Sequence, residues 1–314
     1  IIFDVGTLLR KRLMAKDEYL ITDRPLIALT IFAMPMILGS FFQQVYNMAD
    51  SIIVGRFVGS SALAAVGACA ALTNVFICVA LGAGVGAGVL VSRYFGAKEY
   101  GKMKTVVSTS LLSFLVLSLL LSVFGFSFSY AMMEALQTPS DILKDAVLYL
   151  RVYFIGFPFL FMYNILSTMF TSVGESKIPL GLLIFSSILN IFLDLWMVRT
   201  LGLGVFGAAL ATLIAQGVSA VLSLPIFFYR IKRYQSSFRC FDLEELSSIL
   251  RIAVPSVLQQ STVSVGMMIV QSVVNPFGTQ ALAGYSATMR VENVFALIFV
   301  SIGNAVSPFV SQNL

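Results

Sequence analysis

The sequence contains no histidine, and only three of its 314 residues are cysteines. Without histidine, Ser-His-Asp catalysis is excluded and the usual zinc and haem sites lose their commonest ligand. Cys69, Cys78 and Cys240 show neither the CxxC spacing of a metal or redox motif nor a disulfide framework. We interpret them as packing residues and predict no cofactor.

Charged residues are also scarce, at 11% of the chain, against roughly 25% in a soluble domain. Hydrophobic residues make up 58%, and the mean hydropathy is +0.93. This composition indicates an all-α polytopic membrane protein in a lipid bilayer. The net charge of +5 does not indicate nucleic-acid binding, because the basic residues lie in short breaks between apolar runs.

Long apolar runs are the dominant feature of the sequence. A helix needs about 20 apolar residues to cross a bilayer. The breaks in hydropathy predict eight membrane spans, at residues 25–54, 62–92, 105–130, 146–171, 178–199, 205–230, 248–274 and 281–311.

Lysine and arginine are unevenly distributed between the two sets of breaks. The breaks on the side of the N-terminus hold most of them. In membrane proteins the cytoplasmic loops are the ones enriched in lysine and arginine. This bias predicts a cytoplasmic N-terminus in a plasma-membrane protein. The opposite side holds only Arg56, Lys144, Arg151 and Arg199.

The first and seventh spans are related by an internal repeat. With a shift of 220 residues, Ala33-Met34-Pro35 aligns with Ala253-Val254-Pro255, and after a one-residue gap Asn74-Val75-Phe76 aligns with Asn293-Val294-Phe295. Six spans separate the copies, so the repeat is parallel, as in several transporter folds built from two halves. Pro35 has a counterpart in the second copy, but Asp50 aligns with Val270. The acid is therefore expected in one half only.

The repeat predicts a two-lobe organisation. The second copy stops within its second span, so we expect a C-terminally truncated chain with about four further helices missing. Met14 is a plausible start, which makes residues 1–13 possible upstream sequence. The expected parts are a cytoplasmic segment at 1–24, a six-helix N-lobe at 25–230, an inter-lobe loop at 231–247 and the start of a C-lobe at 248–314.

Several motifs resemble one transporter family. They are Gln43 to Asp50 (QQVYNMAD), Val54 to Gly59 (VGRFVG), Gly174 to Lys177 (GESK) and Asn190 to Asp194 (NIFLD). Together they resemble the multidrug and toxic compound extrusion (MATE) transporters. The resemblance implies twelve helices in two six-helix lobes and export of amphipathic, often cationic, compounds driven by H⁺ or Na⁺. We expect a monomer that is not an enzyme.

The same resemblance implies which residues bind the coupling ion. It makes Asp50, Asn190, Asp194 and Thr212 the candidate H⁺ or Na⁺ site in the N-lobe. It also implies substrate or gating roles for Tyr46, Asn164 and Pro35, with the first helix bending at the proline. Because the seventh span carries no carboxylate, the chain is more similar to the DinF-type branch than to the NorM branch.

The spacing of these residues gives the assignment a physical basis. Tyr46 and Asp50 are four residues apart, as are Asn190 and Asp194, so each pair shares one helix face. A charge in hydrocarbon is costly, and two neighbouring carboxylates in a low dielectric should not both stay ionised without a cation. Local hydrogen bonding near a helix end is the alternative interpretation of each aspartate.

Two other features have structural alternatives. Pro35 weakens the first helix locally, which fits either a moving hinge or a static kink. The glycines of the second span predict close helix packing rather than phosphate binding, because no strand precedes them. They are Gly82, Gly84, Gly86 and Gly88.

Two rival functions fit the sequence less well. A lipid-linked oligosaccharide flippase of the same superfamily is expected to line its cavity with cationic side chains, yet Arg290 is the main basic residue inside a span. An intramembrane enzyme needs a catalytic motif, and HExxH, GxSxG and GxGD are all missing from the sequence. A multidrug exporter that takes small organic molecules is therefore the favoured prediction.

Overall fold

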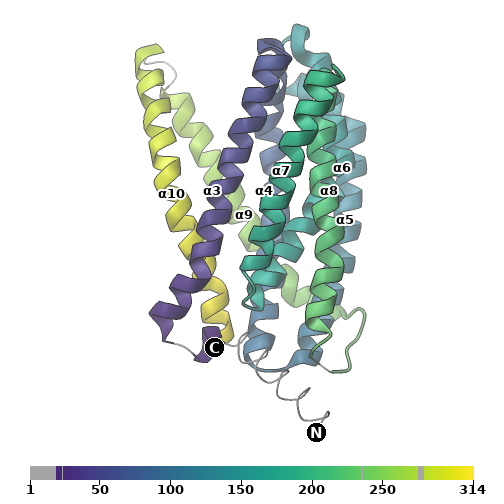
Figure 1. The fold of residues 1–314 in the computed structure, drawn as a ribbon, viewed down its shortest axis with the longest axis vertical. Helices are drawn as coiled ribbons and strands as arrows, with labels where there is room; N and C mark the ends of the chain where they lie inside the picture. Colours follow the sequence, from purple (N-terminus) through teal and green to yellow (C-terminus); the bar gives the residue numbers. More distant parts are fainter. Residues whose placement is uncertain (1–18, 23, 235, 275–278) are drawn as a thin grey trace.

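The computed structural model describes residues 19–22, 24–234, 236–274 and 279–314, and in these ranges every regular element is a helix (Figure 1). Residues 1–18, which include the possible start Met14, lie outside them. The elements are α2 (Tyr19–Thr22), α3 (Pro25–Phe57), α4 (Ser60–Gly96), α5 (Tyr100–Ala135), α6 (Ser140–Ser172), α7 (Lys177–Asp194), the π-helix η1 (Leu195–Thr200), α8 (Gly204–Ile231), α9 (Leu243–Val274) and α10 (Thr279–Asn313).

All eight predicted spans fall on these helices. Seven helices in the described part of the chain are long and apolar enough to cross a membrane. The remaining predicted span, 248–274, lies within the 32-residue helix α9, several side chains of which are outside the description. The helices are longer than the predicted spans because their polar ends continue beyond the apolar stretch. The prediction of an all-helical polytopic membrane protein is confirmed.

Helix α6 forms the centre of the bundle and packs against α4, α5 and α8. Its aromatic side chains Phe154, Phe157 and Phe161 are fully buried. Phe157 makes edge-to-face contacts with Phe76 of α4 and with Phe161, at ring-centroid distances of 5.7 and 5.6 Å. Such pairs add about 0.5–1.5 kcal/mol each beyond the apolar area that they bury. This core holds α6 in place beside the cavity described below.

The glycines of α4 allow two neighbouring helices to approach closely. A Cβ atom on Gly86 would lie 2.6 Å from the Ala253 Cβ of α9, and one on Gly88 would lie 2.7 Å from the Thr168 Cγ2 of α6. At Gly86, where backbone atoms of α9 lie as close as 2.8 Å, α9 itself would have to shift, whereas at Gly88 the side chains of α6 would have to move. The prediction of close packing is therefore confirmed, and it extends to the α9-facing Gly82 and the α6-facing Gly84.

The contacts of the last two helices follow the symmetry of the internal repeat. The repeat relates α3 to α9 and α4 to α10, and it places Pro35 and Pro255 inside equivalent helices. Exchanging the copies converts the contact between α3 and α10 into a contact between α9 and α4, and both contacts are present. The arrangement is that expected of a parallel repeat whose halves face each other.

The segment between α8 and α9 is attached to the start of α5. The Arg239 N–H donates to Thr105 Oγ1 over 3.1 Å. The Asp242 N–H donates to Thr109 Oγ1 over the same distance. Asp242 Oδ1 in turn accepts a hydrogen bond from the Glu244 N–H over 3.0 Å and caps α9. That backbone bond, with help from Arg239, holds the pKa of Asp242 below its usual range. Arg239 and Asp242 are thus attached to the start of α5.

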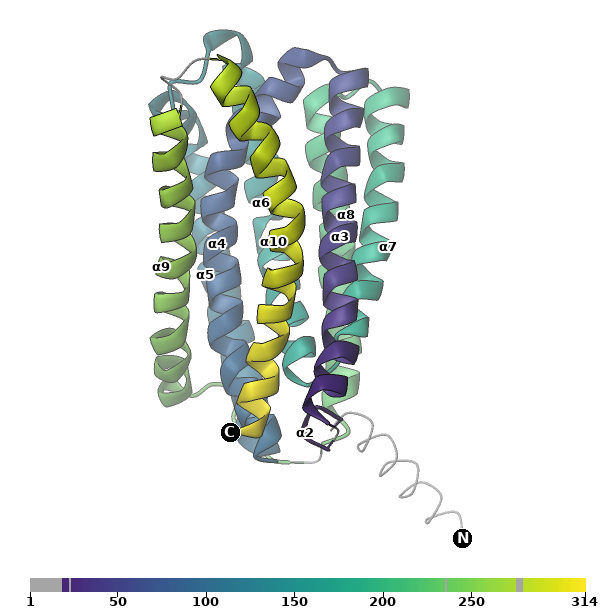
Figure 2. The same cartoon turned by 90° about the vertical axis from the view of Figure 1, so that its left-hand side faces the viewer.

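The two ends of the bundle differ. We call the end that carries α2 and the last turn of α10 the terminal end. Helices α3 and α10 converge there and diverge towards the opposite end, as both views show (Figures 1 and 2). Midway along, the Ser40 and Ser301 hydroxyls hydrogen-bond across the pair over 3.0 Å.

Candidate functional site

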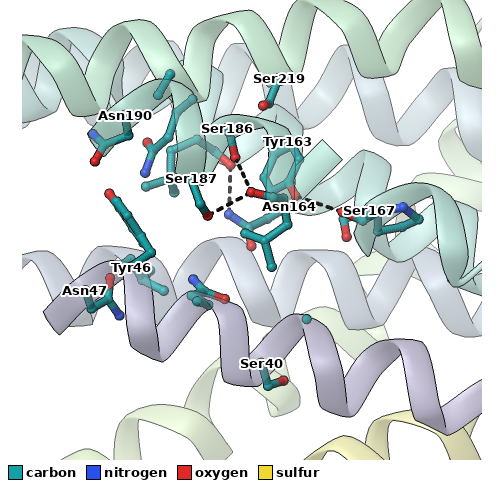
Figure 3. Close-up of a pocket in the computed structure, with 18 of the residues that line it drawn as sticks. Ser40, Tyr46, Asn47, Tyr163, Asn164, Ser167, Ser186, Ser187, Asn190 and Ser219 are labelled. Carbon is teal, nitrogen blue, oxygen red and sulfur yellow. Dashed lines mark hydrogen bonds between the residues drawn. The ribbon is translucent and has the colours of Figure 1, made fainter. Parts of the chain in front are cut away.

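A cavity of about 590 Å³ lies among helices α3, α4, α6, α7, α8 and α10. Its wall is rich in uncharged polar side chains, chiefly hydroxyls and amides (Figure 3). Among the described residues that line it, Asp50 is the one charged side chain, and none is lysine or arginine. The cavity therefore has a polar surface with acidic character at one position.

The two predicted acids meet beside this cavity. Asp50 on α3 is half-buried, and Asp194, the last residue of α7, is 0% exposed. Their carboxyl groups lie within hydrogen-bonding reach of each other. The Oδ1 atom of each is buried and has no hydrogen-bond partner among the described residues. Two ionised carboxylates this close repel each other, and a shared proton or a cation between them would relieve the repulsion.

Asn190 and Thr212 complete the predicted set. Asn190 lies one turn before Asp194 and is 1% exposed. In the orientation that satisfies both ends of its amide, Nδ2 donates to Asp194 Oδ2 over 2.8 Å and Oδ1 accepts from the Thr212 N–H over 3.2 Å. The Thr212 Oγ1 donates to the Ala208 carbonyl over 3.1 Å. The structure thus brings together Asp50, Asn190, Asp194 and Thr212, the four residues that the resemblance in sequence implied.

Tyr46 joins the group from α3. Its side chain lies within hydrogen-bonding reach of the Thr212 side chain, so it connects α3 to α8 one turn from Asp50. In Figure 3 its ring points across the cavity towards Asn190. On α7 Asn190 thus bonds the acid one turn away, whereas on α3 Tyr46 contacts Thr212 rather than Asp50.

The other two predicted residues lie further from the acids. Asn164 lines the cavity from α6, but its Nδ2 donates to the Leu160 carbonyl of its own helix over 2.8 Å. Pro35 is buried inside α3 and lines the part of the cavity nearer the terminal end, about four turns before Asp50. Among the described contacts, none joins Asn164 or Pro35 to the carboxyl pair.

The backbone changes form directly after Asp194. Helix α7 ends there and the π-helix η1 follows, a form that occurs mostly as short segments and often at functional sites. The Asp194 side chain makes no capping hydrogen bond at this junction. Its neighbours are instead Asp50 and Asn190. Asp194 therefore does not cap η1, but its bond from Asn190 is local to α7, so local hydrogen bonding near a helix end is part of its role.

Sequence reasoning missed several residues of the cavity wall. On α8, Thr212 is followed by Gln216 and Ser219, and on α6 Tyr149 and Tyr153 precede Asn164. The signal was available, because these polar residues recur at spacings of three and four within apolar runs and so form one helix face. Tyr149 also lies close enough to Asp50 to interact with it electrostatically.

The oxygen atoms of this site suit a proton or a hard monovalent cation. Carboxylate, amide and hydroxyl oxygens prefer such ions to soft metals. No cluster of three or more His, Cys, Asp or Glu side chains occurs among the residues that the structure describes. A polar cavity around a carboxyl pair, within a bundle of membrane-spanning helices that contains an internal repeat, is the kind of site found in membrane transporters.

The chain belongs to the MatE family. The family model matches residues 35–196 and 255–314, which together are more than half of the chain. The two matched segments begin 220 residues apart, the same spacing as the internal repeat. The resemblance to MATE transporters seen in the sequence is thereby confirmed.

Known proteins similar to this chain are bacterial multidrug proteins and MATE structures. The chain is 30% identical over 289 residues to YpnP, a probable multidrug resistance protein of Bacillus subtilis (strain 168), covering 91% of this chain and 64% of YpnP. It is 28% identical to the multidrug export protein MepA of Staphylococcus aureus (strain bovine RF122 / ET3-1), covering 95% and 67%. A crystal structure of MATE in the straight conformation matches with a TM-score of 0.86 at 26% identity, covering 94% and 66%.

The chain therefore spans about 64% of the length of the first of these curated relatives.

Proposed function

We propose that this chain forms the N-lobe and the start of the C-lobe of a secondary active multidrug exporter. It antiports amphipathic and cationic organic compounds against H⁺ or Na⁺, by alternating access between the lobes. The observation that carries the proposal is the polar cavity, with the pair of Asp50 and the buried Asp194 beside it and no lysine or arginine among its described lining residues. The names of the relatives, which are multidrug proteins, support the same substrate class.

The coupling ion acts through Asp50 and Asp194. A proton or Na⁺ on the pair lowers its net charge, and loss of that ion leaves two neighbouring negative charges. These negative charges favour binding of an organic cation in the cavity. The coupling ion and the substrate therefore compete for the negative charge of the carboxyl pair. Asn190 and Thr212 orient the Asp194 carboxyl, and Tyr46 ties the α3 side of the site to α8. A ligand shifts the transport equilibrium only by its different affinity for the two states, and this competition supplies that difference.

Helix α3 transmits the change in charge. Pro35 has no N–H to donate to the Ile31 carbonyl, so one helical hydrogen bond is missing at that point. Bending there costs less than in an uninterrupted helix. Because Pro35 and Asp50 both line the cavity, a bend that follows ion binding changes the room available for substrate.

We assign the terminal end of the bundle to the cytoplasm of a plasma-membrane protein. The support is the excess of Lys and Arg in the segments at that end, including Lys98, Lys102, Lys104, Arg230 and Lys232. The opposite end, where α3 and α10 diverge, then faces the exterior (Figure 2). A monomer in the lipid bilayer is the proposed functional unit.

The flippase alternative is not favoured. A lipid pyrophosphate requires basic side chains in the cavity, and the described lining residues include none. The side chain of Arg290, the basic residue noted within a predicted span, lies outside the described residues. The carboxyl pair also gives the cavity the wrong charge for such a substrate.

Efflux of ethidium, an amphipathic organic cation, tests the proposed function. Cells that express the protein with its native flanking sequence are loaded with dye, and efflux is followed in media with and without Na⁺ at fixed pH, with and without a protonophore. We expect one of the two gradients to support efflux and its removal to reduce the rate to that of cells without the protein. Efflux that persists after both gradients have been removed would contradict ion coupling.

A further inference from the structure

The terminal end of the bundle is closed by contacts between the lobes. Helix α10, from the second copy of the repeat, reaches α6 and α2 at this end. In Figures 1 and 2 it runs towards α3 as the chain approaches its C-terminus. Any exchange of access between the two sides of the membrane must break these contacts. They were not anticipated by the sequence motifs.

Gln312 is the most deeply buried polar residue of α10 at this end, with 3% of its surface exposed. Its Nε2 donates to the Ser172 carbonyl of α6 over 2.6 Å. Ser172 is the last residue of α6, where no following helical N–H satisfies the carbonyl. The Ser92 hydroxyl of α4 donates to the same oxygen over 3.2 Å. One buried backbone acceptor, the Ser172 carbonyl, thus receives a donor from α4 and another from α10.

The backbone around Gln312 fits against a glycine. A Cβ atom on Gly96, at the end of α4, would lie 2.6 Å from the Gln312 carbonyl carbon and 2.7 Å from its Cα. These are backbone atoms, so they cannot move aside as the tip of a flexible side chain can. A side chain at position 96 is incompatible with the observed approach of α10. The hydrogen bond and the glycine therefore depend on the same close contact.

The short helix α2 adds further contacts at the terminal end. The Asn313 Nδ2 donates to the Leu20 carbonyl over 3.1 Å, and the Tyr19 hydroxyl donates to the Gly174 carbonyl over 3.2 Å. Leu20 is 1% exposed and packs in a cluster with Ala305 of α10. The segment is joined to α10 on one side and to the connection between α6 and α7 on the other. It bridges the lobes at the terminal end.

We propose that Gln312 is the latch of a cytoplasmic gate: its amide, held in the recess at Gly96, keeps the lobes closed at the terminal end through the Ser172 carbonyl. This inference rests on the proposed exporter function. The Gln312 Oε1 is buried and has no hydrogen-bond partner among the described residues. A buried acceptor of this kind costs free energy, so it offsets part of the gain from the Nε2 bond. A latch so balanced can open within a transport cycle.

Distance measurements between spin labels test the latch. Nitroxides are attached to cysteines replacing the exposed residues Lys177 of α7 and Leu314 after α10, in a Cys240→Ser background because Cys240 is the exposed native thiol. The protein carries its native flanking sequence and is reconstituted in liposomes without dye or ion gradients. The label-to-label distances of the Gln312→Glu variant are then compared with those of the protein that keeps Gln312, at alkaline and at acid pH.

The carboxyl introduced by Gln312→Glu cannot donate a hydrogen bond when ionised, but it can when protonated. The short distance between the two labels reports the closed terminal end, and the long distance reports the open one. At alkaline pH we expect the ratio of the long-distance to the short-distance population to rise about tenfold, the effect of losing one such bond. At acid pH the short distance should return in this variant, beyond any change in the unmodified protein. Unchanged distances at both pH values in Gln312→Glu would overturn the proposal.

Gly96→Ala provides a second route to the same conclusion if Gln312→Glu does not fold. It leaves the amide intact but fills the recess, so it should also favour the long distance. Gly303→Ala on α10 is its matched control, since a Cβ there meets nothing within 4 Å, and it should leave the distances unchanged. A Gly96→Ala protein that keeps the short distance contradicts the latch. Because these distances need no transport, a failed latch is distinguishable from a failed exporter function, which the ethidium assay reports.

Discussion

Replacing Asp194 by asparagine is expected to reduce ethidium efflux to the level of cells that lack the protein. Asp194 is fully buried, contacts the Asp50 carboxyl and accepts a hydrogen bond from Asn190. Asparagine retains the shape of the side chain but cannot carry the proton or charge that couples ion to substrate. The measurement is dye efflux per unit of membrane-inserted protein.

The matched control for this substitution is Asp145→Asn. Asp145 is exposed near the start of α6, outside the cavity. It should transport at the normal rate, whereas Asp50→Asn should be as inactive as Asp194→Asn. Undiminished efflux by the Asp194 variant would remove the carboxyl pair from the mechanism.

Gly86→Ala is expected to destabilise the protein by about 1–3 kcal/mol, the usual range for a side chain forced into a packed interior. The added Cβ would lie 2.6 Å from the Ala253 Cβ and 2.8 Å from the Ile249 carbonyl oxygen of α9. Separating α4 from α9 removes contacts along one side of the interface between the lobes. The loss is measured as a lower unfolding temperature in detergent.

Gly67→Ala makes the same chemical change at another position of α4. A Cβ there has no neighbour within 4 Å. Alanine also favours a helix over glycine by roughly 0.5–1 kcal/mol, so the unfolding temperature should stay constant or rise. Equal losses for the two variants would show that close packing against α9 is not the cause.

Much of the fold could be predicted from hydropathy and spacing. The apolar runs located the helices, and the alignment of Pro35 with Pro255 related the two copies before their contacts were known. Helix ends were less certain, because polar turns such as the start of α9 continue a helix beyond its apolar part. Nothing in the residues Leu195–Thr200 distinguishes a π-helix from an α-helix, so η1 could not be foreseen.

The site was predictable only in part. Four-residue spacing placed Tyr46 with Asp50 and Asn190 with Asp194, but spacing within a helix does not show which helix faces which. That step came from the resemblance to MATE transporters. The contact of Gln312 with Ser172 lay beyond sequence reasoning altogether, since its acceptor is a backbone carbonyl that every residue possesses.

The central claim is that one coupling ion and the organic cation compete for the carboxyl pair in the N-lobe. The most direct test is equilibrium binding of ethidium to the purified protein across a range of pH and Na⁺ concentration. If one ion is exchanged for one dye molecule, linkage predicts that Kd rises about tenfold for each tenfold increase in that ion, within the range where the pair binds it. Asp194→Asn should abolish the dependence. A Kd that is indifferent to both H⁺ and Na⁺ in the unmodified protein would contradict the account.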